Sequence, residues 1–201
     1  MKTYTLFAGV NGAGKSTLYK LLDINFGLRI NVDEIIRTKY NHDWQNPNAQ
    51  MQAGRIAVKL LQNCLQGNVS FNQETTLTGL TIITNIQKAK TNGFNISLYY
   101  VGLESAELSV ERVEIRKKAG GHGIPKEDLH RRYSNSFKNL EHILPLCDNV
   151  QVYDNSSNNP FDILNPLLIV KNNLDVKWNE NKCPQYLKNV LQKYHEWLKL
   201  K

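Results

Sequence analysis

Short apolar runs alternate along the chain with longer segments in which apolar residues recur about every three to four positions. The short runs predict buried β-strands, and the longer segments predict amphipathic helices. Such an alternation is typical of strand–helix units around a mostly parallel sheet. The expected strands cover residues 3–8, 28–32, 69–73, 95–102 and 150–153. The expected helices begin near residues 14 and 33 and cover 48–65, 80–90, 105–118 and 126–143.

The last fifth of the chain departs from this alternation. Residues 156–160 are rich in turn formers, so we expect a boundary between a core of residues 1–157 and an appendage of residues 158–201 in the same domain. In the appendage, Asn172-Asn173 lies between two short apolar runs, which predicts a hairpin with a two-residue turn. The predicted fold class is therefore α/β: a five-stranded, mostly parallel sheet flanked by helices, with a C-terminal β-hairpin and helix.

The expected final helix covers residues 184–200 and mixes aromatic residues with lysines. At helical spacing, Tyr186, Tyr194 and Trp197 predict an amphipathic helix that packs its aromatic side chains inward. A nucleic-acid surface is the alternative interpretation, because aromatic and basic residues also alternate in such surfaces.

Length and charge narrow the class of protein. A chain of 201 residues is long enough for one domain with a sizeable core. No stretch approaches the ~18 apolar residues of a membrane span, and the first apolar run is too short for a signal peptide. Three cysteines without metal-ligand spacing predict reduced thiols, so we expect a cytoplasmic protein. The net charge of +7 predicts an anionic partner without choosing its kind.

A glycine-rich segment follows the first expected strand and opens the first helix. Residues 9–16, GVNGAGKS, match the phosphate-binding pattern G-x-x-x-x-G-K-[ST] in full. Backbone N–H groups of such a loop point at phosphate oxygens, Lys15 can bridge the β- and γ-phosphates, and Ser16 can ligate Mg²⁺. We therefore expect Mg²⁺ with ATP or GTP as co-substrate. The expected nucleotide-binding residues here are Gly9, Asn11, Gly12, Ala13, Gly14, Lys15, Ser16 and Thr17.

Carboxylates follow two other expected strands, at the sheet edge where open parallel sheets bind ligands. Asp33 follows residues 28–32, and Glu74, with Thr75 beside it, follows residues 69–73. A carboxylate there can accept a proton from an acceptor hydroxyl or hold Mg²⁺ through water. Two alternatives stay open: Asp33 as a helix N-cap, and Glu74 as a loop residue that faces solvent. Motor and transporter ATPases need four apolar residues before an aspartate. The expected strand at residues 69–73 lacks this pattern, which argues against those classes of protein.

Basic residues gather in the two helices around residues 112–132. Arg112 and Arg116 lie four apart and share a helix face, while Arg131 and Arg132 stand in the next helix across a glycine-rich link. Phosphoryl transfer requires positive charge near the moving group and exclusion of water. The pattern predicts a helical lid that carries arginines over bound phosphates. A solvated, charged helix face is the alternative for any single arginine.

Several of these segments together resemble zeta-toxin-like P-loop kinases. They are NVDEI at residues 31–35, NQETT at 72–76, and GGHGIP at 120–125 followed by RRY at 131–133. The resemblance runs from residue 1 to about residue 157. It implies a kinase with a P-loop core that phosphorylates a hydroxyl of a small acceptor. In better-known zeta toxins this is a sugar hydroxyl of UDP-N-acetylglucosamine, and its phosphorylation poisons cell-wall synthesis, but the acceptor of this chain stays open.

The resemblance also implies roles for single residues and a protein partner. If the chain is a toxin, a small helical antitoxin is expected to block its nucleotide cleft. The implied roles are general base for Asp33, acceptor contact for Glu74 with Thr75, stabilisation of the transferred phosphoryl group for Arg116 with Arg131 or Arg132, and proximity to the nucleotide base for Asp154 and Asn155.

Two other classes of function stay open. The net charge permits a nucleoside or nucleic-acid-end kinase, and the phosphate-binding loop alone also fits an NTP-driven switch that transfers nothing. Asp33 favours transfer over a switch, because a switch mainly needs to position water.

Overall fold

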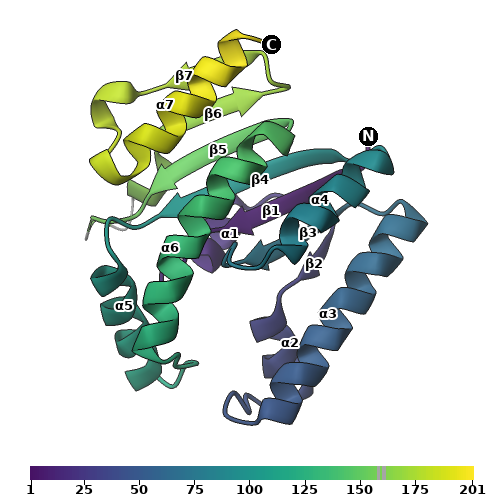
Figure 1. The fold of residues 1–201 in the computed structure, drawn as a ribbon. Coiled ribbons are helices and arrows are strands. Elements are labelled where there is room, and N and C mark those ends of the chain that lie inside the picture. Colours follow the sequence, from purple (N-terminus) through teal and green to yellow (C-terminus); the bar gives the residue numbers. More distant parts are fainter. Residues whose placement is uncertain (158, 160–161) are drawn as a thin grey trace.

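The computed structural model describes residues 1–157, 159 and 162–201, which form one large sheet with helices packed on it (Figure 1). The boundary expected at 156–160 therefore falls partly on residues 158 and 160, outside the described residues. The strands are β1 (Thr3–Ala8), β2 (Leu28–Ile30), β3 (Phe71–Thr75), β4 (Asn95–Gly102), β5 (Asn149–Asp154), β6 (Leu168–Lys171) and β7 (Asp175–Trp178). The helices are α1 (Lys15–Leu22), α2 (Val32–Lys39), α3 (Pro47–Gly67), α4 (Thr81–Thr91), α5 (Ala106–Lys118), α6 (Lys126–Ile143) and α7 (Gln185–Lys199).

The strands lie in the order β2-β3-β1-β4-β5-β6-β7, and the first five are parallel. This confirms the α/β class. The predicted count of five strands is wrong, because the C-terminal hairpin joins the same sheet through antiparallel pairing of β5 with β6. The chain winds to one side of β1 as far as β3 and to the other side from β4 onward. A ligand crevice is therefore expected at the carboxyl end of β1.

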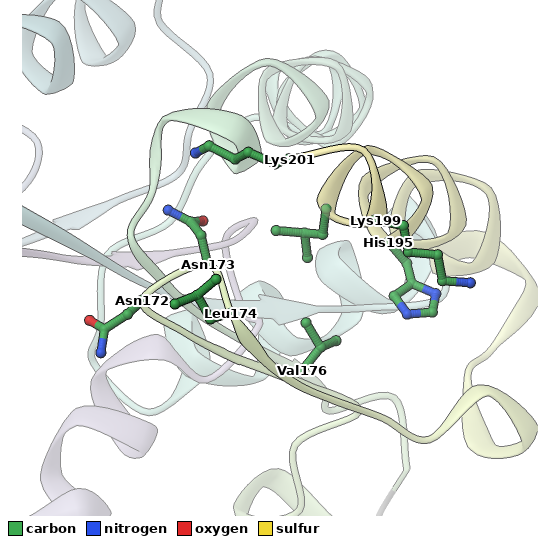
Figure 2. A pocket seen from close by; sticks show the side chains of 8 residues that line it. Asn172, Asn173, Leu174, Val176, His195, Lys199 and Lys201 are labelled. Atoms are coloured by element: carbon green, nitrogen blue, oxygen red, sulfur yellow. The ribbon is translucent and has the colours of Figure 1, made fainter.

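The hairpin turn is one residue longer than predicted. Asn172 and Asn173 both have positive φ, 51° and 58°, which asparagine tolerates better than most residues. Lys171 pairs with Asp175, so Leu174 also belongs to the turn. Beside it lies a hollow of about 620 Å³, where side chains of the hairpin face those from the end of α7 (Figure 2).

Two apolar clusters hold the helices on opposite faces of the sheet. One joins residues of α3, α4, α6 and α7 to the first face, and the other joins α1 to the second. In α7, Tyr194 is buried and stacks on Trp197 with ring centroids 5.7 Å apart, which confirms the inward packing of its aromatic residues. Within the described residues, no helix has the length and apolar character needed to cross a membrane.

The strand β3 begins two residues later than predicted. Asn68 takes a left-handed conformation at the end of α3, and the Val69 N–H donates to the Cys64 carbonyl oxygen, so Val69 closes the helix instead of opening the strand. Glu74 consequently lies within β3, opposite Phe7 of β1, and does not follow the strand.

Two helix pairs extend from the sheet toward the bottom of Figure 1, α5–α6 on the left and α2–α3 on the right. The loop from β1 to α1 lies at the strand end between them, and residues from both pairs line the cleft described below.

Candidate active site

The loop between β1 and α1 approaches the neighbouring strand so closely that it requires glycine. Gly9 has a φ of +141°, and a Cβ there would lie 2.2 Å from the Val101 carbonyl oxygen. Gly14, with a φ of +95°, caps the N-terminus of α1 in a left-handed conformation. The loop is therefore a backbone-lined turn that ends on a helix N-terminus, as phosphate binding requires.

Lys15 is buried inside this loop. Its Nζ donates to the Val10 carbonyl oxygen at 2.9 Å. Burial lowers the pKa of Lys15, and the carboxylates of Glu74 and Asp33 oppose that shift. A bound phosphate would favour the charged lysine in the same way as these carboxylates.

The outer side of the loop rests on α5 and on the end of β5. Ser109 Oγ donates to the Asn11 carbonyl oxygen at 2.7 Å, and Asn155 Nδ2 donates to the Ala13 carbonyl oxygen at 2.9 Å. The Asp154 carboxylate instead accepts from the Tyr186 hydroxyl of α7 at 2.6 Å. Of the two residues expected near the nucleotide base, Asn155 therefore contacts the loop, whereas Asp154 connects β5 to α7. The Arg112 side chain also points along this side and donates to the Ser157 carbonyl oxygen at 3.1 Å.

Glu74 faces the phosphate-binding loop. The Ser16 hydroxyl lies 2.9 Å from both oxygens of its carboxylate, Arg29 Nη2 lies 2.7 Å from one of them, and Asn31 Nδ2 donates to the same oxygen at 2.9 Å. With the Glu74 side chain only 13% exposed, the solvent-facing alternative is wrong. Thr75 accepts a hydrogen bond from the Leu77 N–H on its Oγ1 at 3.0 Å.

Arg29 of β2 fixes the position of Glu74. Its guanidinium also bonds Glu34 at 2.8 Å and the Asn72 side chain at 3.1 Å, and it stacks 3.7 Å above the centre of the Tyr19 ring. A planar guanidinium suits several fixed acceptors at once. The sequence analysis gave no role to Arg29 or Asn72. Both are polar residues within expected buried strands, and this unusual position could have marked them as part of the site.

Asp33 lies in the first turn of α2 with an exposed carboxylate. Asn31 is the N-cap of this helix, since its side chain accepts from the N–H groups of Asp33 at 2.9 Å and Glu34 at 3.3 Å. The N-cap alternative for Asp33 is therefore wrong. Its carboxylate has no hydrogen bond or ion pair among the described residues. It faces a cleft of about 200 Å³ lined by Ser16, Asn31, Asp33, Glu34, Arg37, Trp44, Arg116, Gly121 and His122.

The lid arginines differ in direction. Arg116 of α5 lines this cleft, and its Nη2 donates to the His122 carbonyl oxygen at 2.8 Å. Arg132 of α6 reaches the phosphate-binding loop, where its Nη1 lies 3.4 Å from Asn11 Oδ1. Arg131 bonds Asp128 at 2.7 Å on the outside of α6, with 61% of its side chain exposed. The structure thus brings Arg116 and Arg132 to the loop and cleft, but not Arg131.

This arrangement is matched by known proteins. The family model described as zeta toxin matches residues 1–163. The chain belongs to the zeta toxin family. It is therefore a P-loop phosphotransferase. An uncharacterized protein from Haemophilus influenzae is 35% identical over 128 residues, which are 63% of this chain and 89% of that protein.

Solved structures share the fold of this zeta toxin family member. A chain from the PezAT chromosomal toxin–antitoxin system of Streptococcus pneumoniae is 17% identical with a TM-score of 0.56, over 100% of this chain and 88% of that one. A chain of AvrRxo1-ORF1:-ORF2 with ATP is 15% identical with a TM-score of 0.62, over 96% and 63%. A chain of the Pnkp1/Rnl/Hen1 RNA repair complex is 19% identical with a TM-score of 0.56, over 70% and 46%.

The residues of this zeta toxin family member fit a Mg²⁺ ion that binds with nucleotide. Ser16 and Glu74 place a hydroxyl and a carboxylate together at the start of α1, and Mg²⁺ prefers oxygen ligands. Among the described residues, no group of three or more His, Cys, Asp or Glu side chains forms a metal cluster.

Three residues of the cleft in this family member were given no role from the sequence. Trp44 comes from the segment between α2 and α3, and its ring lies 5.8 Å from the ring of His122 in the link between α5 and α6. Burial lowers the pKa of His122, against the opposing effect of Asp33. Arg37 stands one helical turn after Asp33. Helical spacing places Arg37 beside Asp33, whereas only tertiary folding brings Trp44 and His122 there.

Proposed function

We propose that this chain transfers the γ-phosphate of ATP or GTP to a hydroxyl of a small acceptor, with Asp33 as the general base. The observation that carries the proposal is that the exposed Asp33 carboxylate, which has no partner among the described residues, lines the same cleft as Ser16 of the phosphate-binding loop. An acceptor hydroxyl in this cleft would lie between a base and the γ-phosphate, as phosphoryl transfer requires.

In the proposed reaction, the acceptor oxygen forms a bond to the γ-phosphorus as its proton passes to the Asp33 carboxylate. The bond between the γ-phosphorus and the β–γ bridging oxygen breaks, and the nucleoside diphosphate leaves. Lys15 and the loop N–H groups hold the β- and γ-phosphates. Arg116 and Arg132 supply positive charge to the moving group from the lid.

Ser16 and Glu74 would hold Mg²⁺, Ser16 directly and Glu74 through water. A bound Mg²⁺ would supply positive charge to the phosphates of the nucleotide. The two carboxylates thus have different roles. Glu74 helps to bind the metal on the nucleotide side of the site, and Asp33 accepts the proton on the acceptor side.

We further propose that the chain acts as a toxin with an antitoxin that blocks its nucleotide cleft. Membership of the zeta toxin family and the shared fold with a chain of the PezAT toxin–antitoxin system support this role. The family resemblance makes UDP-N-acetylglucosamine the first acceptor to test.

Incubation of the purified protein with γ-labelled ATP or GTP and a panel of UDP-sugars, small hydroxylated compounds, nucleosides and RNA ends tests the proposal. Label on a small acceptor is the expected result. Release of labelled phosphate without any labelled acceptor would identify a switch or a hydrolase and overturn the kinase proposal.

Adjacent lid arginines provide a matched test of the proposed charge stabilisation. We expect Arg132→Gln to lower kcat by about 10²–10³-fold, because it removes a cation beside the loop. Arg131→Gln removes only an exposed ion pair and should change kcat by less than about threefold. Steady-state transfer assays on both variants measure the difference. Equal losses would show that the direction of the Arg132 side chain does not matter.

A further inference from the structure

The cleft at Asp33 contains donor groups that the protein itself does not satisfy. Trp44 Nε1 and Arg116 Nε are both buried, and neither has a hydrogen-bond partner among the described residues. Arg37 lines the same cleft with an exposed side chain, and its guanidinium makes no hydrogen bond or ion pair with any described residue. Buried N–H groups without acceptors are rare in folded proteins, and a ligand that binds beside them can supply the missing acceptor.

The charges of the cleft do not balance. Glu34 is matched by Arg29 at 2.8 Å, which leaves the Asp33 carboxylate as the one unpaired negative charge among the lining residues that the structure describes. Two guanidinium groups, of Arg37 and Arg116, line the cleft with that carboxylate. Burial lowers the pKa of His122 and so favours its neutral form, which adds no charge to the cleft. One positive charge is left over before nucleotide binds, and once Arg116 is assigned to the transferred phosphoryl group, Arg37 is the remaining cation among the described lining residues.

The two guanidinium groups come from opposite sides of the cleft. Arg116 belongs to the lid and is assigned above to the transferred phosphoryl group. Arg37 follows Asp33 by four residues on α2, so both side chains lie on one helix face about 5–6 Å apart. Trp44 extends this acceptor side toward His122. Arg37 and Trp44 are therefore donors placed on the base's side of the cleft.

We propose that Arg37 and Trp44 bind an anionic group of the acceptor, one helical turn away from the hydroxyl that Asp33 deprotonates. The acceptor is then a small hydroxylated compound with a carboxylate or phosphate near the reacting hydroxyl. This inference rests on the proposed kinase function. A neutral acceptor is discriminated against, because it leaves the exposed Arg37 guanidinium without a counter-charge and the buried Trp44 Nε1–H without an acceptor.

The first experiment measures binding through Trp44 itself. In the Trp178→Phe/Trp197→Phe protein, Trp44 is the single tryptophan. With ADP and Mg²⁺ present, its fluorescence is titrated with glycerol, glycerate and glycerol 3-phosphate, and with N-acetylglucosamine, its 1-phosphate and UDP-N-acetylglucosamine. We expect at least one charged compound to bind about 10–100-fold tighter than its neutral parent. The carboxylate and phosphate members show which anion is preferred.

The second experiment measures kcat/KM for transfer from γ-labelled ATP to the same compounds. Arg37→Gln should bring the charged-to-neutral ratio of kcat/KM close to 1, mainly by raising KM for the charged acceptor. Trp44→Phe, which keeps an aromatic ring but removes Nε1–H, should lower that ratio by about 5–20-fold. Arg55→Gln, an exposed arginine of α3 outside the cleft, is the matched control and should keep the ratio.

The outcomes separate this inference from the proposed function. Transfer with equal kcat/KM for charged and neutral compounds, insensitive to Arg37→Gln, overturns the inference and leaves the kinase. Charge-selective binding that Arg37→Gln abolishes, without transfer to any acceptor, supports the anion site and contradicts the kinase. If the protein shows no charge-selective binding and no transfer, both the inference and the proposed function are contradicted.

Discussion

We expect Asp33→Asn to lower kcat for phosphoryl transfer by about 10²–10⁴-fold, the typical contribution of a positioned general base. Asparagine has the same shape but cannot accept the acceptor's proton. The backbone of α2 should stay in place, because Asn31 and not Asp33 caps the helix. ATP affinity should change little, since Lys15 and the loop remain. Single-turnover transfer and nucleotide titration measure the two quantities separately.

The control for this variant is Asp23→Asn. Asp23 is an exposed carboxylate at the C-cap of α1 with a φ of 45°, a conformation that asparagine tolerates well. The Asp23→Asn variant should keep the transfer rate of the unmodified protein. If Asp33→Asn transferred phosphate as fast as this control, Asp33 would not be the base.

The second large effect is expected for Lys15→Ala. Loss of the cation inside the loop should abolish measurable transfer, about 10³-fold or more, because the β- and γ-phosphates lose their main charged contact. If the chain is a toxin, growth arrest on its expression should also disappear. Arrest that persists with Lys15→Ala would separate the toxin role from catalysis, and absence of arrest with the unmodified chain would remove the toxin role alone.

The stability of the Lys15→Ala variant should not fall with its activity. Lys15 is a buried cation whose pKa is lowered by burial, so its removal relieves an unfavourable desolvation in the nucleotide-free protein. We expect a melting temperature no lower than that of the unmodified chain. The stabilisation by ATP, about 2.7 kcal/mol at a concentration of 100 Kd, should be lost. Lys20→Ala, in the exposed last turn of α1, should retain it.

Much of the fold could be predicted because its signals are local. The bounds of β4 and α6 agree with the expected ranges 95–102 and 126–143 to the residue, since apolar periodicity marks a strand or helix without reference to its partners. The phosphate-binding loop is recognisable for the same reason: its glycines and lysine are close together in the chain. Pairing is not local. That β6 continues the sheet depends on contacts with β5, such as Val150 with Val170.

The site likewise has parts that local sequence signals predict and parts that depend on contacts between distant segments. The position of Asp33 after a strand placed it in the crevice, but the role of Asn31 as the helix cap required the observed hydrogen bonds. The direction of Glu74 follows from Ser16, 58 residues away, and from Arg29, 45 residues away. Trp44 and His122 meet only because two separate helix pairs fold toward each other.

The opposite directions of Arg131 and Arg132 set limits on how the lid can vary in length. Neighbouring residues on a helix are rotated by about 100° from each other, so one residue inserted into α6 ahead of position 132 would turn its guanidinium away from Asn11. An insertion in the glycine-rich link before α6 would leave the rotation of α6 unchanged, because Leu129, Leu140 and Ile143 anchor the helix in the protein interior, but it would disturb the His122 carbonyl oxygen that accepts from Arg116. Variation in length should therefore be selected against within the first two turns of α6, and in the link it should be tolerated only where it spares the contact between Arg116 and His122.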